Sequence, residues 1–270
     1  QQQQQQQPKE EEAEKNVVVE KSKQSNDAKV HKKAKDNSEK EVPSLATLAL
    51  PFVLTRMQLI QHSFPLPLIG NEQSATTAAA CACDGYVRAP AGGGGKVVAI
   101  DCEMVRTNDG KLSLAWLVAL DEHDNILVNT LVKPSLPVVD HLTRFSGVCE
   151  ETLANVNTTL HDAQQLLFQH VGSDTILCGH SLENDLHALR IVHELIIDTS
   201  VLYPRGDGMS AVVKHSLRYL ANKHLGRDIQ NEVSHLPTED ASAALALATL
   251  RLRAANQAHN NADDGATGST

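Results

Sequence analysis

Aromatic side chains are scarce in this chain of 270 residues, at 3% of the total. Cysteine is also sparse: the five cysteines are scattered and mostly lie in apolar segments, which is typical of a reducing compartment and not of a disulfide framework. Cys81-Ala-Cys83 has no second cysteine or histidine pair at zinc spacing, which argues against structural zinc. Prolines and polar residues interrupt the apolar stretch from Leu45 to Leu68, so the sequence predicts no membrane span.

An excess of positive charge is absent as well. The net charge is -9 and the isoelectric point is near 5.8, whereas proteins that bind nucleic acid usually neutralise phosphates with Lys and Arg. This objection is weak for an enzyme whose site is a group of carboxylates, because bound divalent cations then supply the positive charge that meets the phosphate.

Composition divides the chain into four parts. Residues 1–42 are a glutamine run followed by a Lys- and Glu-rich stretch without apolar periodicity, so we expect a disordered low-complexity tail and a candidate binding segment for a protein partner. Residues 43–95 predict a short helical piece, then loop, and end in the flexible glycine linker Gly92–Gly95. Residues 96–254 form the predicted folded domain, and residues 255–270 a second disordered tail.

The folded part predicts an α/β domain with a mixed five-stranded sheet flanked by helices. Three strands form a meander, and two further strands alternate with helices. Ser181 and Thr238 are the expected N-caps of two helices, and Gly226 the expected stop of another. The predicted strands are 96–100, 112–120, 126–132, 175–178 and 196–199, and the predicted helices are 160–171, 182–192, 214–225 and 238–253.

Five polar residues stand out, although each has an ordinary explanation when taken alone. Asp101 and Glu103 lie at the end of the first strand, where alternation directs both side chains to the same side. Acidic residues at a strand end can also be ordinary polar residues of a turn. Asp185 suits the positive end of its helix through the dipole alone. His235 and Asp240, around the start of the last helix, can be cap or surface residues.

Taken together, the five residues describe a two-metal hydrolytic site. Hydrolysis of a phosphodiester needs hard cations, which polarise the phosphate and lower the pKa of a water. Carboxylates are suitable ligands for two Mg²⁺ or Mn²⁺ ions, and a histidine nearby can accept the proton of the attacking water.

Three motifs in this order resemble the DEDDh nucleases, and more closely the Rex-type RNA exonucleases. They are Ile100-Asp-Cys-Glu-Met104, Gly179-His-Ser-Leu-Glu-Asn-Asp-Leu186 and His235-Leu-Pro-Thr-Glu-Asp240. Linking segments resemble the same subgroup, namely Leu131-Val-Lys-Pro134, Thr143-Arg-Phe-Ser-Gly-Val148, Asp198-Thr199, His215-Ser-Leu-Arg-Tyr-Leu220 and Leu225-Gly-Arg-Asp-Ile-Gln230. The stretch from Val53 to Pro67 is similar to the segment that these proteins carry ahead of the nuclease domain.

The resemblance implies an RNase H-like fold, a monomeric nuclease domain, and removal of nucleoside 5′-monophosphates from the 3′ end of RNA. It also implies a nuclear role in RNA processing. Asp101, Glu103 and Asp240 would share one metal, Asp101 would also bind the second, and Asp185 would act beside that second metal. His235 would be the general base, because the H-x-x-x-x-D spacing marks the histidine branch.

Substrate contacts are a further expectation from the resemblance. Met104 is expected to line the pocket of the terminal nucleotide, and Arg144 and Ser146 to help hold the substrate. Each has a structural alternative, as a core methionine or as part of an ordered loop. One departure concerns Ser113 and Trp116, which stand where the Rex-type pattern usually has an acid and an arginine, and this bears on RNA affinity.

Several other functions stay open on the sequence. A DNA or sugar-indifferent 3′→5′ exonuclease would use the same carboxylates, because the 2′-hydroxyl is read elsewhere. A catalytically silent RNA-binding protein could keep the fold, and an α/β domain with incidental acids is a third alternative. With so few aromatic side chains for base stacking, we expect the protein to grip only the last few nucleotides.

Overall fold

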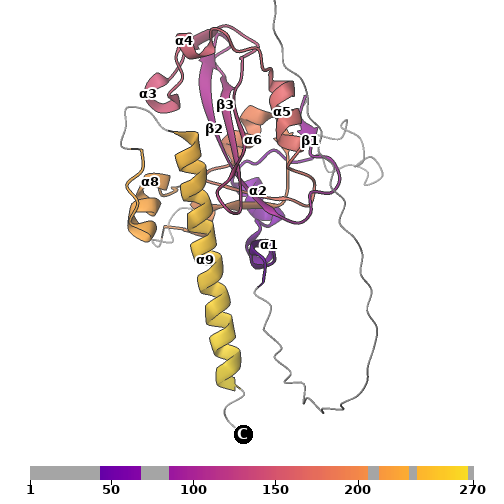
Figure 1. Cartoon of the computed structure of the whole chain (residues 1–270), viewed down its shortest axis with the longest axis vertical. Coiled ribbons are helices and arrows are strands. Elements are labelled where there is room, and N and C mark those ends of the chain that lie inside the picture. Colours follow the sequence, from indigo (N-terminus) through magenta and orange to yellow (C-terminus); the bar gives the residue numbers. More distant parts are fainter. Residues whose placement is uncertain (1–42, 68–84, 206–212, 231–235, 267–270) are drawn as a thin grey trace, which may run out of the picture. The chain divides into compact units, whose positions relative to one another are not determined.

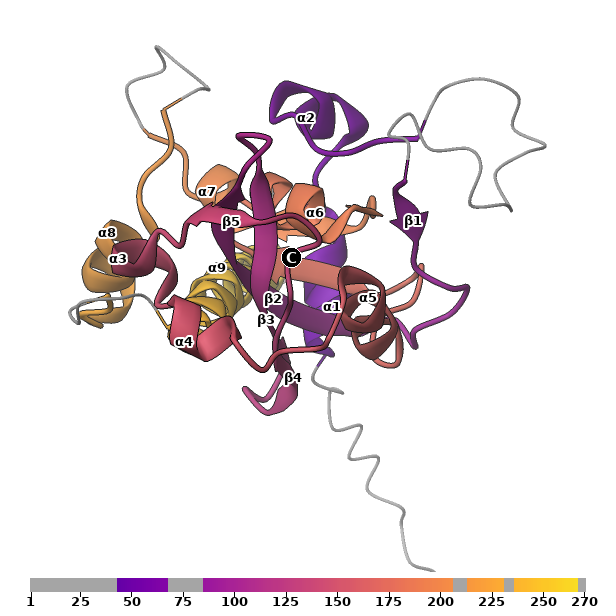
Figure 2. The same ribbon diagram turned by 90° about the horizontal axis from the view of Figure 1, so that it is seen from above.

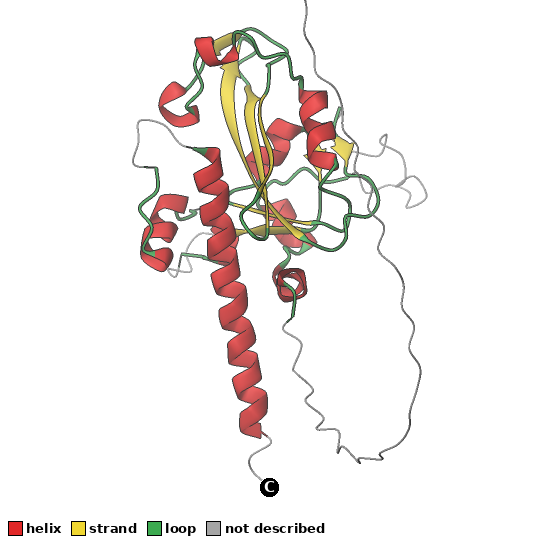
Figure 3. Ribbon diagram, viewed as in Figure 1, coloured by secondary structure: helices red, strands yellow, loops and turns green. Residues whose placement is uncertain are grey.

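A mixed β-sheet forms the centre of the computed structural model, which describes residues 43–67, 85–205, 213–230 and 236–266 (Figure 3). The strand order is β4-β3-β2-β6-β8, and the short strand β5 pairs with the far end of β2. The strands are β2 (Val97–Thr107), β3 (Leu112–Asp121), β4 (Ile126–Leu131), β5 (Val138–Asp140), β6 (Ile176–Gly179) and β8 (Ile196–Asp198). This arrangement confirms the predicted mixed sheet, with β5 as an addition.

The pairing directions follow from the connections. β2, β3 and β4 are joined by short turns and pair antiparallel, which is the predicted meander. β6 and β8 are parallel to β2, since helical connections bring the chain back in the same direction. The prediction that the first strand ends at its acids was wrong. β2 continues to Thr107, because β3 pairs with it beyond Glu103 and β5 supports its last residues.

Two apolar layers lie on opposite faces of the sheet, and the alternation of β2 sorts its side chains between them. Val98, Ile100 and Cys102 face the larger layer, formed with α5 (Leu160–Phe168), α6 (Glu183–Leu189) and α2 (Arg56–Gln61). Val97 and Ala99 face the other layer, formed with α1 (Leu45–Ala49) and the long helix α9 (Pro237–Ala266). Figure 2 shows α9 and α5 on either side of β2 and β3.

The segment ahead of the folded domain is part of both layers. Ala46 and Ala49 of α1 are buried beside α9, and Leu59 of α2 is buried on the other face. Between them, after the turn η1 (Leu50–Phe52), the backbone N–H of Leu54 donates to the carbonyl of Ile196 at 2.8 Å. This bond covers the free edge of β8, which would otherwise expose unpaired backbone groups.

The glycine linker is held against a neighbouring loop, in contrast to the expected flexible hinge. The carbonyls of Pro90 and Gly92 accept hydrogen bonds from the backbone N–H groups of Ser173 and Asp174. The approach is so close that a Cβ atom added to Gly172 would clash with the carbonyl oxygen of Gly92.

The last helix differs from its prediction at both ends. Thr238 is not the N-cap, because Pro237 already occupies the first turn and the N–H of Asp240 bonds to the carbonyl of Leu236. Residues 255–266 were expected to be disordered, but they are helical and continue α9. Residues 254–258 are rich in alanine, which extends an existing helix at little cost. No helix among the described residues has the length and apolar character needed to cross a bilayer.

Asp198 caps two helices, a role that the sequence assigned in part to Ser181. Ser181 has a φ of 58°, so its hydroxyl does not cap α6. Instead, the carboxylate of Asp198 accepts hydrogen bonds from the N–H groups of Ser181 and Leu182 at the start of α6. It also accepts from the N–H and hydroxyl of Ser200 at the start of α7 (Thr199–Leu202). The side chain is 1% exposed.

The remaining short elements complete the described chain. Helix α8 continues as one wide turn that ends at Gly226 with a φ of 64°, as predicted for a glycine stop. Ile191 and Val192, predicted to be helical, pair instead with a two-residue strand. The elements are β1 (Val87–Arg88), α3 (Thr143–Ser146), α4 (Glu150–Leu153), β7 (Ile191–Val192), α8 (Leu217–Leu220) and its extension Ala221–Leu225.

Replacing Asp198 is expected to destabilise the fold more than replacing an exposed capping acid. Asp198→Ala removes both caps and leaves buried N–H groups without an acceptor, so we expect a loss of about 3 kcal/mol in the free energy of unfolding. Asp162→Ala, which affects only the exposed cap of α5, is the control and should cost clearly less. Urea denaturation of both variants measures the difference, and equal losses would contradict the capping role.

Candidate metal centre

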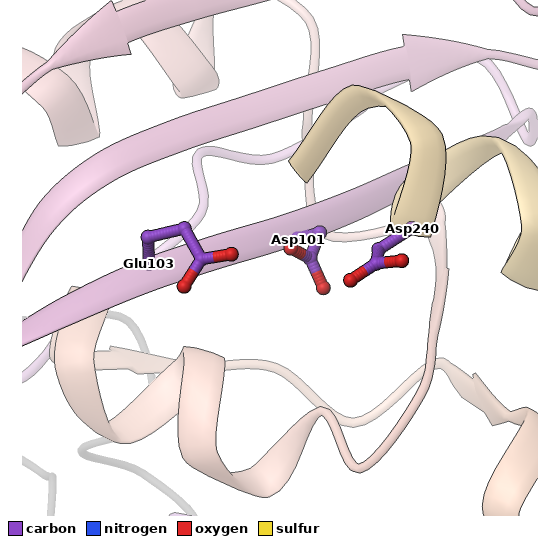
Figure 4. A group of neighbouring side chains, drawn as sticks. All are labelled: Asp101, Glu103 and Asp240. Atoms are coloured by element: carbon purple, nitrogen blue, oxygen red, sulfur yellow. The ribbon is translucent and has the colours of Figure 1, made fainter. Parts of the chain in front are cut away.

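Three carboxylates converge where β2 meets the first turn of α9. Asp101 and Glu103 continue the side of β2 that faces α9, following Val97 and Ala99, and Asp240 comes from α9 itself. One oxygen from each carboxylate lies within 4.8 Å of the other two. Figure 4 shows the three side chains directed toward a shared space. Residues from two distant parts of the sequence therefore form one group of acids, here called the acid triad.

Asp185 lies beside the acid triad on α6. Its Oδ1 atom accepts a hydrogen bond of 2.7 Å from the backbone N–H of Cys102, the residue between the two acids of β2. The side chain is 5% exposed. The strand that carries Asp101 and Glu103 therefore also fixes the orientation of the fourth carboxylate. All four acids singled out in the sequence are brought into one region.

Burial and mutual repulsion change the acidity of these groups. Burial raises the pKa of Asp101 well above its ordinary value, and the charges of Asp185, Asp240 and Glu103 add to the effect. Burial, reinforced by Asp240 and Asp185, raises the pKa of Glu103 to about 8. Burial likewise raises the pKa of Asp185 to about 8, against the opposing hydrogen bond from Cys102. Without a cation, the four carboxylates cannot all be ionised at neutral pH at low energetic cost.

Gln230 orients one carboxylate of the acid triad, and sequence reasoning missed it. Its side-chain amide donates to Asp240 Oδ2 at 2.9 Å, while its backbone N–H donates to Glu239 Oε2 at 3.0 Å. The backbone of Gln230 has a φ of 58°, which turns the chain toward the start of α9. In the sequence, Gln230 is distinguished only as the last residue of the Rex-type segment Leu225–Gln230, and that segment does not indicate which of its residues contacts a carboxylate.

A largely buried ion pair supports the first turn of α6. Lys214 Nζ donates to Glu183 Oε1 at 2.6 Å, and the two side chains are only 20% and 17% exposed. Glu183 precedes Asp185 in the same turn, so Lys214 joins the segment before α8 to the helix that carries the fourth carboxylate. Together with the cap from Asp198, this pair limits the movement of Asp185.

His235 lies outside the described residues, so its assignment as general base stays a prediction. Cys81, Cys83 and the whole predicted tail of residues 1–42 likewise lie outside the described part of the chain.

The three expected substrate contacts lie in different surroundings. Met104 follows a bulge in the pairing of β2 and β3 and is half-buried against the larger apolar layer. Arg144 is exposed on α3. Ser146 is 1% exposed, donates its hydroxyl to the carbonyl of His141 at 2.7 Å and accepts from the N–H of Val148. Its hydroxyl is used within the loop, which favours the structural alternative for Ser146.

Trp116 lies beside Glu103. The two residues are directly opposite in the register of β2 and β3, so their side chains share the face of the sheet that carries the acid triad. The indole N–H donates to Asn129 Oδ1 on β4 at 2.7 Å. An aromatic ring fixed by this bond therefore stands where the Rex-type pattern has an arginine.

Comparison with known proteins identifies the domain. The chain is 35% identical over 226 residues to an uncharacterised exonuclease of Schizosaccharomyces pombe. It is 42% identical over 158 residues, 58% of this chain, to the human RNA exonuclease 1 homolog. The matched region is similar to these exonucleases, in agreement with its Rex-type motifs, and is here called the Rex-type domain. No protein-family model matches the chain.

The matches cover a large share of this chain but a small share of each relative. The S. pombe match covers 81% of this chain but 35% of the relative, and the human match covers 13% of the relative. Among eight of these relatives, the chain spans between 10% and 35% of their length. The Pan2 catalytic unit of Neurospora crassa shares the fold at 23% identity and a TM-score of 0.54, covering 77% of this chain and 32% of that one. The Rex-type domain therefore has an RNase H-like fold, as predicted.

The donor set of the Rex-type domain fits divalent cations. Its ligand atoms are carboxylate oxygens, which Mg²⁺ and Mn²⁺ prefer, and the raised pKa values show that positive charge is needed for full ionisation. Cys102, which would favour softer metals, points to the opposite face of β2.

The metal-free protein should lose stability as the pH rises. Glu103 and Asp185 have ordinary pKa values of 4.5 and 3.8, and pKa values of about 8 in the fold. Between these values the folded protein binds more protons than the unfolded chain, so a rise in pH favours unfolding. The melting temperature in EDTA should therefore fall from pH 5 to pH 8, and Mg²⁺ should restore it at pH 8. The variant Glu103→Gln/Asp185→Asn is the control and should show a flatter profile. A wild-type profile that is as flat as that of the control would contradict this electrostatic account.

Proposed function

We propose that the protein is a 3′→5′ exoribonuclease that removes nucleoside 5′-monophosphates by hydrolysis at a two-metal centre. The observation that carries the proposal is the convergence of Asp101, Glu103 and Asp240, with Asp185 fixed beside them by the backbone of β2. Several relatives are named RNA exonucleases, which supports RNA as the substrate.

Each carboxylate has its own place in the proposed metal centre. Asp101, Glu103 and Asp240 would hold one cation, Asp101 would also bind the second, and Asp185 would act beside that one. Bound Mg²⁺ or Mn²⁺ supplies charge that polarises the phosphodiester and lowers the pKa of the attacking water. The acid triad therefore needs a fixed geometry, and Gln230 contributes by orienting Asp240.

His235 completes the proposal as the general base. It precedes Asp240 at the spacing of the DEDDh histidine branch, and an imidazole has an intrinsic pKa suited to accepting a proton at neutral pH. The 3′→5′ direction and a nuclear role in RNA processing are proposed from the same resemblance.

Nuclease assays with two variants test the reaction. Purified protein with Mg²⁺ should shorten 5′-labelled single-stranded RNA from its 3′ end and leave matched DNA largely intact. Asp101→Ala should abolish the ladder, because it removes the carboxylate expected to contact both cations. His235→Ala should slow it by at least about 100-fold, the usual contribution of a general base.

The control variant and the alternative outcomes separate the competing functions. Asp174→Ala removes an exposed acid near the opposite end of β6 and should leave the rate unchanged. Equal digestion of DNA would indicate a sugar-indifferent exonuclease. Digestion of neither substrate with Mg²⁺ or Mn²⁺ would contradict the proposed activity and favour a silent RNA-binding protein.

A further inference from the structure

A hollow of about 270 Å³ lies away from the acid triad, between the end of α7, helix α8 with its extension, and α9. The residues used below are Tyr203, His215, Lys223, His224 and Arg251, all of which line it. None of the described residues that line the hollow is acidic, although the chain as a whole carries a charge of -9. Figure 1 shows α8 alongside α9, the helix that begins at the acid triad.

Ring systems form much of this region. Tyr203 and His224 are in contact with their ring centroids 4.7 Å apart. His215 is stacked on Tyr219 at 4.6 Å, with an angle of 20° between the planes, and Tyr219 is 44% exposed. Two of the three tyrosines of an aromatic-poor chain therefore contact histidines that line the hollow. Flat rings at the surface are suited to stacking with an unpaired nucleobase.

Positive charge surrounds the rings. Lys223 Nζ lies 5.4 Å from the centroid of the Tyr219 ring, and Arg251 is exposed on α9. Within the described part of the chain, neither cation has a carboxylate at ion-pair distance. Burial lowers the pKa of His224, and the neighbouring Lys223 and His215 lower it further, which is consistent with an electropositive surface. A ligand that fits has a flat face and a negative charge.

The hollow and the acid triad lie along the same helix, α9. Arg251 lies about three helical turns, or ~16 Å, beyond Asp240, which places the two residues on the same side of the helix. Between them, Ala243, Ala244 and Leu247 are covered by α8. The hydroxyl of Tyr203 donates to the carbonyl of Leu247 at 2.8 Å and fixes one wall of the hollow to α9. This distance corresponds to about five nucleotides of a stacked strand and fewer of a stretched one.

We propose that this hollow binds an unpaired nucleotide of RNA upstream of the 3′ end, with its base against the rings of Tyr203, His215 and His224 and its phosphate near Lys223 and Arg251. The proposal rests on the proposed function, which places the 3′ end at the acid triad. With this hollow, the protein would contact RNA beyond the last few nucleotides. The low aromatic content of the sequence had led us to expect contacts with those last nucleotides only. Short substrates would end before the hollow and would not use it.

Substrate length separates this second site from the catalytic centre. The full chain with Lys223→Ala/Arg251→Ala should hydrolyse a single-stranded RNA dodecamer with a kcat/KM about tenfold lower than wild type, since two phosphate-neutralising charges are lost. Its kcat/KM for a dinucleotide should be unchanged. Arg56→Ala/Lys111→Ala removes two exposed cations elsewhere and is the matched control, expected to leave both substrates unaffected. Equal losses on both substrates, or no loss on the dodecamer, would overturn the proposal.

Two variants at one position test the role of the rings. His224→Phe keeps a flat ring beside Tyr203 and should retain activity on the dodecamer, whereas His224→Ala should lower kcat/KM several-fold, again without effect on the dinucleotide. An equal kcat/KM of the two variants on the dodecamer would show that stacking on the ring at position 224 does not contribute to binding.

A binding measurement keeps this test independent of the proposed reaction. Fluorescence anisotropy with the labelled dodecamer in EDTA reports affinity without hydrolysis. Weaker binding by Lys223→Ala/Arg251→Ala than by its control supports the hollow even if the wild type cleaves no RNA. A labelled glutamate-rich peptide that binds with the same dependence, while RNA binding is unaffected, would assign the surface to an acidic protein partner instead.

Discussion

Repulsion between carboxylates that share a largely buried space is the constraint on which the rest of this structure depends. Glu103 and Asp240 are 9% and 4% exposed, and each has an oxygen within 4.8 Å of one on the other acids of the triad. Burial alone raises the energy of each ionised group, and proximity raises it further. The fold must therefore hold the acids together in the absence of cations, and binding of a cation would relieve the strain that the fold maintains.

Several features provide that restraint from outside the acid triad. Asp185 is bonded to the backbone of β2, and its helix is held by the double cap of Asp198 and by the pair of Glu183 with Lys214. The start of α9 is held by Gln230, and the body of α9 by apolar contacts with the sheet. The segment ahead of the domain adds α1 to the same layer. These supports are distributed over the whole domain, which explains why the site residues come from three separate elements.

The sequence predicted the outline of this arrangement because alternation and motif order are local properties. Asp101 and Glu103 were expected on one side of a strand, and that side is the one that faces Asp240. The end of β2 was misjudged because pairing with β3 and β5 extends it through polar residues. The caps at Ser181 and Thr238 were misjudged because the actual start of α6 depends on Asp198, distant in sequence, and that of α9 on Pro237. Contacts such as Gln230 with Asp240 leave no pattern in a single sequence.

A basic, ring-lined hollow that suits a nucleotide lies about 16 Å along α9 from the acidic centre. Binding of divalent cations by the acid triad is the property on which the proposed function depends. The most direct measurement is an anomalous difference map from crystals soaked in Mn²⁺ with a ribonucleoside 5′-monophosphate. The account predicts manganese peaks at coordination distance, about 2.1 Å, from oxygens of Asp101, Glu103 and Asp240, with a second peak at Asp101. Occupied manganese elsewhere, with none at these three carboxylates, would contradict it.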